Sequence, residues 1–442
     1  MIIFEGSNIK LTMKKIFLSV VLLLCSVVVF AQPKMKLVKV EVTPDHADWL
    51  YECGEKASFK VSVRTASNAP VDGDIYFEIS EDMLPALDKG NITLKGGEAT
   101  IKGYTMRKPG FLRCRVWKKE NNHLYEECAT VGFSVDKIKA TTVLPDDFKT
   151  FWAGELEANK KIEMLPQMTL IPERCTSKVD VYSARFQSFR KGAFIYGTLC
   201  VPKNLKEKAP AILIVPGAGC RARQGFMAEA ERGVVTFEIG IHGISTTMFN
   251  DPEIYNNLRS GGLYHYYDNS FESREKCFYR RVYVGCARAI DFLAQLDFVD
   301  EERIAVTGGS QGGALTIVTS YLNPKVKYAA AIYPAMCDLT GRLEDQGDAW
   351  PYLFRGKTGG TKERIEACRY YDVVNFARHL SLPMWFTYGY NDMVVCPTSM
   401  QACYNAVTAP KELLTVPQSR HYTYPEQREA RREWLLDKLL KK

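Results

Sequence analysis

The sequence predicts an α/β protein in which a mostly parallel sheet, covered by helices on both faces, follows a small antiparallel β sandwich. Three observations predict this fold. Residues from about 34 to 138 contain short segments that alternate polar and apolar side chains. From Val179 onward, apolar strands alternate with helical patterns, as in doubly wound sheets. A Gly-x-Ser-x-Gly motif at residues 308–312 then joins a short apolar strand to a helix.

The composition bounds the class of protein. Of the 442 residues, 46% are hydrophobic and 12% are aromatic, which is typical of a globular chain with a sizeable core and room for two domains. The net charge of +7 is spread without a basic tract, so we expect no nucleic-acid partner. The 13 cysteines include no Cys-x-x-Cys pair, so we expect no metal site, and nothing indicates another cofactor.

Residues 1–31 are predicted to be a secretory signal peptide, with Met13 as an alternative start. Lys14 and Lys15 form a charged beginning, residues 16–30 are apolar, and Ala31 ends a small-residue cleavage site. The apolar run of about 15 residues is shorter than the ~20 needed to span a bilayer. We therefore expect cleavage rather than a membrane anchor, export to the periplasm or the extracellular space, and no stable membrane insertion afterwards.

Residues 32–140 are expected to form a sandwich of immunoglobulin-like size. The alternating segments are separated by turn residues and lie at 36–42, 57–63, 74–79, 112–117 and 130–135. No catalytic constellation is visible in them. Cys114 and Cys128 flank a turn, so they either face each other across a hairpin as a disulfide or act as small buried hydrophobes.

Residues 141–442 are expected to form the second, larger domain. Its candidate strands are 211–215, 234–238, 304–307, 328–332, 384–388 and 412–416. Its candidate helices are 224–232, 280–296, 311–322 and 426–440, with an amphipathic entry segment at 148–161. This alternation implies a mostly parallel sheet buried on both faces.

Ser310 is the candidate nucleophile. A sharp, strained turn between strand and helix points such a hydroxyl out of the sheet, and Gly308 and Gly312 let the backbone cross closely there. The backbone N–H of Gln311 would face the developing oxyanion, and the N–H of Ala218, in the loop after strand 211–215, is the candidate second donor. The alternative is a glycine-rich turn that carries a passive serine.

The general base follows from chain order. A serine nucleophile needs a histidine to take its proton and a carboxylate to orient the histidine, and α/β-hydrolases place them in the order Ser, acid, His. Of the six histidines, only His379 and His421 follow Ser310. His421 lies between the last strand and the last helix, where this fold places its base, whereas His379 lies inside a helical segment.

The acid has several candidates in the sequence. Asp392 follows strand 384–388, and its loop is near the His421 loop in the chain. The competitors between the serine and the histidine are Asp338, Asp345, Asp348 and Asp372. An ordinary turn aspartate also remains open at residue 392, because Asn-Asp suits a turn.

Several segments of the last two-thirds of the chain match a known pattern. They are the entry segment 145–152, the helix segments 278–283 and 288–293, the elbow 308–313, Asp392 with Cys396-Pro397, and His421. From about Leu144 onward the chain therefore resembles the acetylxylan esterase / cephalosporin-C deacetylase family of α/β-hydrolases. The resemblance implies Ser310, Asp392 and His421 as the triad, and it favours Asp392 over the other aspartates. Acetylated xylo-oligosaccharides and small acetate esters become the expected substrates.

The chain departs from that family in three loops and carries the added N-terminal sandwich. Residues 240–243 stand where the family has Arg-Gly-Gln, and Tyr422 stands where it has a glutamate after the base. Residues 215–218 replace its aromatic-His-Gly-aromatic oxyanion loop. We therefore expect a divergent member whose acyl or leaving-group pocket differs.

The predicted function is that of a serine carboxylesterase that removes acetyl groups from acetylated sugars. The alternatives are a serine peptidase of the prolyl-oligopeptidase type and a non-catalytic carbohydrate-binding protein with a hydrolase fold. Two aromatic stretches, which contain Tyr266 and Trp350, either form a rim that stacks on sugar rings or, as we favour, belong to the core or a subunit contact. An acetylated oligosaccharide or other small acetyl ester is the expected partner, and a homo-oligomer stays open.

Overall fold

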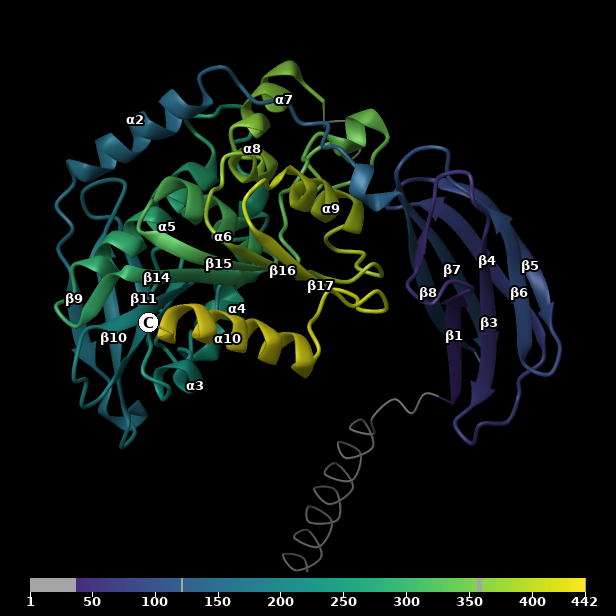
Figure 1. The fold of residues 1–442 in the computed structure, drawn as a ribbon, viewed down its shortest axis with the longest axis horizontal. Coiled ribbons are helices and arrows are strands. Elements are labelled where there is room, and N and C mark those ends of the chain that lie inside the picture. The colour runs from purple at the N-terminus through teal and green to yellow at the C-terminus, as the bar shows by residue number, and fades with distance from the viewer. Residues whose placement is uncertain (1–36, 121, 356–359, 442) are drawn as a thin grey trace, which may run out of the picture.

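The computed structural model describes residues 37–120, 122–355 and 360–441. Within them, a β region formed by the N-terminal strands lies beside a larger α/β region (Figure 1). The expected signal peptide lies outside the described residues. No helix in the described ranges is both long and apolar enough to cross a membrane. The expected division near residue 140 stays a prediction.

The N-terminal β region consists of two sheets. The first pairs β1 (Val38–Pro44), β3 (Ala57–Thr65) and β6 (Glu98–Tyr104). The second runs in the order β2 (Leu50–Tyr51), β8 (His123–Phe133), β7 (Gly110–Glu120), β4 (Gly73–Glu81) and β5 (Ala86–Leu94). All pairs are antiparallel except the short β2–β8 pair. The predicted all-β region is confirmed.

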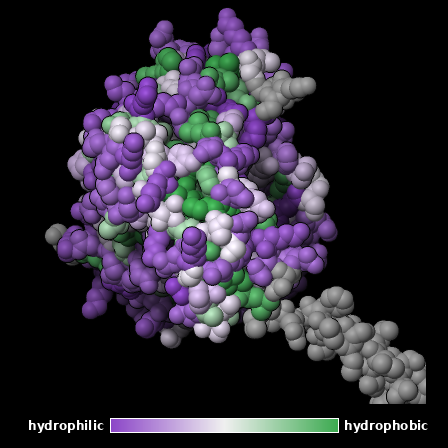
Figure 2. All heavy atoms as spheres, turned by 90° about the vertical axis from the view of Figure 1, so that its right-hand side faces the viewer, coloured by the Kyte–Doolittle hydropathy of each residue, from purple (hydrophilic) through white to green (hydrophobic). Residues whose placement is uncertain are grey.

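Alternation along the strands builds the core of this region. Phe59, Val61 and Val63 of β3 are fully buried, whereas the residues between them are at least partly exposed. Cys114 and Cys128 are buried free thiols, so the structure realises the small-hydrophobe alternative and not the disulfide. Hydrophilic side chains dominate the face of the molecule on this side, with hydrophobic atoms in small groups (Figure 2).

The larger region is built on a nine-stranded sheet in the order β17-β16-β15-β14-β12-β13-β11-β10-β9. The parallel part consists of β13 (Val235–Gly240), β12 (Ala209–Ile214), β14 (Val299–Gly309), β15 (Val326–Ile332), β16 (Met384–Tyr388) and β17 (Lys411–Thr415). The antiparallel edge consists of β11 (Phe194–Pro202), β10 (Val179–Gln187) and β9 (Gln167–Leu170). The predicted mostly parallel α/β-hydrolase sheet is confirmed.

Helices cover both faces of this sheet (Figure 1). One face packs against α2 (Phe148–Lys160), α5 (Phe278–Ala294), α6 (Gln311–Leu322) and α8 (Val373–Ala377). The other face packs mainly against α10 (Pro425–Leu440). Strand β12 shows why both faces need cover: Ala211 and Leu213 contribute to the first core and Ile212 and Ile214 to the second.

The remaining helices lie in the connections. They are α3 (Met227–Ala230), α4 (Pro252–Ser260), α7 (Lys362–Arg369) and α9 (Pro397–Ala406). Helix α9 begins immediately after the loop that follows β16, and this loop carries Asp392. The ends of β14 and β16 and the loop before α10 thus supply the three residues predicted for the triad.

Candidate active site

Ser310 lies on a strained turn between β14 and α6. Its backbone has φ 61° and ψ −125°, a conformation that a residue with a side chain rarely adopts. A Cβ on Gly308 would lie 2.6 Å from the carbonyl oxygen of Val215, and one on Gly312 would lie 2.5 Å from the same atom. Both glycines are therefore required by close backbone packing, and the strain is concentrated at the residue predicted to react.

Three side chains from distant parts of the chain meet at this turn. His421 Nε2 lies 3.0 Å from Ser310 Oγ, and His421 Nδ1 lies 2.7 Å from Asp392 Oδ2. Asp392 is fully buried, whereas the His421 side chain is 23% exposed. Asp392 Oδ1 accepts the backbone N–H groups of Val394 and Val395 at 2.8 and 2.9 Å. The carboxylate is thus oriented by its own loop while its second oxygen holds the imidazole.

The competing aspartates lie elsewhere in the structure. Asp338 accepts hydrogen bonds from Thr141 and Thr142, at the beginning of the α/β region. Asp372 accepts the N–H of Val374 as the N-cap of α8, and Asp348 pairs with an arginine. Among the predicted candidates, the structure brings Asp392 to the histidine, as the family resemblance implied.

Loop 216–219, which follows β12, packs directly on the elbow. A Cβ on Gly312 would lie 3.3 Å from the backbone nitrogen of Gly217, so the two backbones are in contact. Gln311 is the first residue of α6, and the first N–H groups of a helix have no intrahelical acceptor. Its N–H is therefore free to serve an oxyanion, while Ala218, the other predicted donor, is half-buried in the facing loop.

The side chain of Gln311 ties this loop to the core. Its Oε1 accepts hydrogen bonds from the hydroxyls of Tyr266 at 2.7 Å and Tyr279 at 3.0 Å. Its Nε2 donates to the carbonyl oxygen of Pro216 at 3.2 Å. The Tyr266 hydroxyl also accepts the N–H of Gly219 at 3.1 Å. Tyr266 and Gln311 together hold both ends of the loop that carries Ala218.

Of the two interpretations of Tyr266 and Trp350, the structure supports the one that we favoured, the core, and not the sugar-stacking rim. Tyr266 is 5% exposed and Trp350 is 9% exposed, so neither presents a ring face to solvent as a sugar-stacking rim requires. Trp350 packs against Tyr267 with ring centroids 5.1 Å apart. Both residues belong to the core, and the buried Tyr266 hydroxyl supports the oxyanion loop through its hydrogen bonds to Gly219 and Gln311. Sequence reasoning missed this support because Tyr266 and Gln311 are 45 residues apart with no motif joining them.

His242 lies against the same tyrosine. Its ring meets that of Tyr266 edge-on at 4.6 Å and stacks on Phe278 at 5.9 Å. Both ring nitrogens are buried, and neither has a hydrogen-bond partner among the residues that the structure describes. Burial, reinforced by the positive charges of Arg281 and Arg223, lowers the pKa of His242 to about 4. A neutral imidazole therefore stands beside the oxyanion loop at neutral pH.

A groove of about 990 Å³ lies beside the His421 loop. One wall comes from β1 and the beginning of β8, and the other includes Gln418, Arg420 and Tyr422. Its aromatic lining residues are Trp49, Tyr125, Tyr422 and Tyr424. Within the ranges that the structure describes, no group of three or more His, Cys, Asp or Glu side chains could hold a metal ion.

The fold and the site define a serine hydrolase of the α/β-hydrolase class. A profile of the acetyl xylan esterase (AXE1) family matches residues 133–438, and the chain belongs to this family. Acetyl esterase Axe7A of Xylanibacter ruminicola is 36% identical over 397 residues, which cover 89% of each chain. That alignment is too long to fit into the family region alone, so it extends into the N-terminal β region.

Solved structures support the same fold. The acetyl xylan esterase from Paenibacillus sp. R4 superposes with a TM-score of 0.60 at 22% identity, covering 69% of this chain and 98% of that one. Acetyl xylan esterase 1 from Thermoanaerobacterium sp. JW/SL YS485 superposes with a TM-score of 0.55 at 19% identity, covering 69% and 97%. Family membership confirms the predicted carboxylic ester hydrolase over the peptidase and non-catalytic alternatives.

Proposed function

We propose that this chain removes acetyl groups from acetylated sugars, with Ser310, His421 and Asp392 as its catalytic residues. One observation carries the proposal: the continuous hydrogen-bonded series from Ser310 Oγ through the imidazole to the buried carboxylate, at 3.0 and 2.7 Å. Such a series lets the hydroxyl lose its proton as it attacks a carbonyl carbon.

The reaction proceeds in two halves. His421 Nε2 takes the Ser310 proton while Oγ attacks the acetyl carbon, and Asp392 stabilises the imidazolium that forms. The backbone N–H groups of Gln311 and Ala218 bind the oxyanion. His421 then protonates the departing sugar oxygen, which leaves an acetyl-serine. Water, deprotonated by His421, attacks this ester and releases acetate while the proton returns to Ser310.

Acetylated oligosaccharides are the substrate class that we propose. Membership in the AXE1 family supports an acetyl ester, and the aromatic residues of the groove that Arg420 and Tyr422 line supply flat apolar surface of the kind on which sugar rings stack. We also propose export, which rests on the character of residues 1–31 alone. A homo-oligomer stays a prediction.

The decisive variant is Ser310→Ala, assayed by acetate release from 4-nitrophenyl acetate and from acetylated xylo-oligosaccharides. We expect turnover to fall by roughly 10⁴-fold or more. Ser320→Ala is the matched control, because Ser320 lies on the same helix and its hydroxyl donates to the Thr316 carbonyl, away from the triad. Near-native activity of the Ser310 variant would refute the catalytic assignment. Peptide amides, tested alongside, separate an esterase from a peptidase.

A further inference from the structure

The loop that carries Asp392 is held in part by the N-terminal β region. The loop connects β16 to α9, and several of its residues contact β4, β7 or β8. Tyr390 packs edge-on against Phe111 with ring centroids 4.9 Å apart. Asn391 accepts the Thr130 N–H at 2.8 Å and donates to the Cys128 carbonyl at 2.9 Å. One asparagine therefore occupies both backbone groups that β8 offers at this point.

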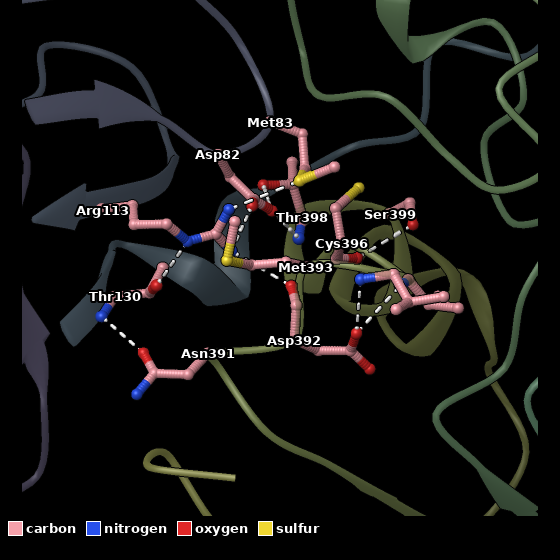
Figure 3. Close-up of polar contacts among 12 residues, drawn as sticks. Asp82, Met83, Arg113, Thr130, Asn391, Asp392, Met393, Cys396, Thr398 and Ser399 are labelled. Atoms are coloured by element: carbon pink, nitrogen blue, oxygen red, sulfur yellow. Dashed lines mark hydrogen bonds and ion pairs between the residues drawn. The ribbon is translucent and has the colours of Figure 1, made fainter. Parts of the chain in front are cut away.

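Arg113 makes the contact nearest to the reacting groups. This β7 residue is 2% exposed, and its Nη2 donates to the carbonyl oxygen of Asp392 at 3.1 Å (Figure 3). Its Nε donates to Thr130 Oγ1 at 2.9 Å. Nη2 also lies 2.8 Å from Asp82 Oδ1 as an ion pair. The guanidinium is planar and rigid, so these contacts fix the direction from which it approaches the loop.

Asp82, which follows β4, holds the far end of the same loop. Its Oδ2 accepts the backbone N–H of Thr398 at 3.1 Å and the Thr398 hydroxyl at 3.0 Å, in the first turn of α9 (Figure 3). Asp82 is fully buried, and burial raises the pKa of its carboxyl against the opposing effect of Arg113. The Asp82–Arg113 pair thus connects the carbonyl of Asp392 to the beginning of α9.

A buried pair of this kind is a poor source of stability by itself. Removing an ion from water costs several kcal/mol, and the attraction between partners often only offsets that cost. The pair supplies position here, because it attaches one loop by hydrogen bonds at two points, the Asp392 carbonyl and, six residues further on, Thr398. The Asp392 carboxylate is then free to use Oδ2 for His421.

We propose that the N-terminal β region is part of the catalytic apparatus, with Arg113 and Asn391 as positioning residues that hold Asp392 against His421. This inference rests on the proposed role of Asp392. The family profile begins at residue 133, so this support comes from outside the region that defines the family. The β region therefore contributes to the rate of the chemical step through the acid.

The test compares Arg113→Met in two backgrounds, the native chain and Asp392→Asn, with 4-nitrophenyl acetate as substrate. Methionine keeps an unbranched apolar stem and removes both the charge and the hydrogen-bond donors. In the native background we expect kcat to fall about 10- to 100-fold with KM nearly unchanged, because displacing a catalytic group by about 1 Å has that effect. In the Asp392→Asn background we expect the same substitution to change kcat less than about 2-fold, because two residues that act as one unit are not additive.

The control is Arg115→Met, two residues along the same strand. Arg115 is 31% exposed and pairs with Glu126 and Glu78, away from the acid loop. We expect it to leave kcat unchanged in both backgrounds. Folded fraction is measured for every variant by chemical denaturation, and rates are expressed per folded molecule. Asn391→Ala removes a second set of contacts to the loop without changing its charge. We expect it to lower kcat in the native background and to change kcat little in the Asp392→Asn background.

Two results would overturn the inference. The first is that Arg113→Met and Asn391→Ala each lower kcat in the Asp392→Asn background by the same factor as in the native background. A general structural role would give that result. The second is that folded variants keep native kcat. If Asp392→Asn keeps native kcat, the proposed triad is wrong and the inference is wrong with it. If Asp392→Asn has a low kcat, the triad is supported, and the Arg113 and Asn391 variants then test the inference by themselves.

Discussion

The neutral histidine beside the oxyanion loop makes a quantitative prediction about stability in acid. In His242→Phe the aromatic contacts to Tyr266 and Phe278 are kept, while the two unpartnered ring nitrogens and the titrating group are removed. The folded-state pKa of His242 is about 4 and its ordinary value is 6.5. The unfolded chain therefore binds a proton more readily than the folded chain, and stability is lost as the pH falls through this window.

The magnitude follows from those two values. At pH 7 both states are mostly deprotonated and the histidine contributes little. At pH 5 the unfolded state is almost fully protonated and the folded state is not, which costs the native protein about 2 kcal/mol of unfolding free energy. The phenylalanine variant lacks this loss, so its advantage over the native chain should grow by about that amount between pH 7 and pH 5.

The assay is urea denaturation of both proteins at pH 7, 6 and 5. Other titrating groups are common to the two chains, so they cancel in the difference between them. His123→Phe is the control, because that side chain is exposed on β8, away from the oxyanion loop, and its ring meets that of Tyr125. We expect it to follow the native pH dependence. If native and His242→Phe lose stability in parallel from pH 7 to pH 5, the burial argument for His242 is wrong.

Two further variants probe the elbow and the oxyanion loop. Gly312→Ala places a Cβ 2.5 Å from the Val215 carbonyl oxygen, and because that neighbour is backbone we expect the free energy of unfolding in urea to fall by about 1–3 kcal/mol and kcat to fall as well. Gly262→Ala is the control, because its Cβ would meet no atom within 4 Å, and we expect it to change neither stability nor kcat. A Gly312 variant with native stability and native kcat would contradict the packing argument. Tyr266→Phe removes the hydroxyl that bonds Gln311 and Gly219, so we expect kcat for 4-nitrophenyl acetate to fall about 10-fold, short of the loss of a whole oxyanion donor. The exposed Tyr264→Phe is its control, and equal kcat in the two tyrosine variants would remove Tyr266 from the support of the loop.

The sequence predicted the parts of this protein that are encoded locally. Ser310 lies in a motif whose spacing reflects one tight backbone crossing, and His421 follows from a rule of chain order. The alternating strands of the β region were visible for the same reason. Strand β5 was not predicted, because it is a mostly exposed edge strand without a buried face to impose a period of two.

The contacts that support the site could not be predicted in this way. The Arg113–Asp392 bond joins residues 279 apart, and no pattern at either position indicates the other. The residues alone also left Asp392 among several aspartates, because an acid is recognised by what it faces and not by its neighbours in the chain. For Trp350 and Tyr266, aromatic composition alone left a sugar-stacking rim and the core both open, and only tertiary packing shows that both rings are buried.

The triad is thus supported from two directions that should be separable by kinetics. Tyr266 acts on the oxyanion loop and Arg113 acts on the acid loop, and no described hydrogen bond joins the two sets. Oxyanion stabilisation and orientation of His421 lower the barrier by different interactions, so Tyr266→Phe should reduce kcat by the same factor whether residue 392 is Asp or Asn. Arg113→Met should lose its effect when residue 392 is Asn. A dependence of Tyr266→Phe on residue 392 would mean that the two loops move together and that the N-terminal β region positions the whole site.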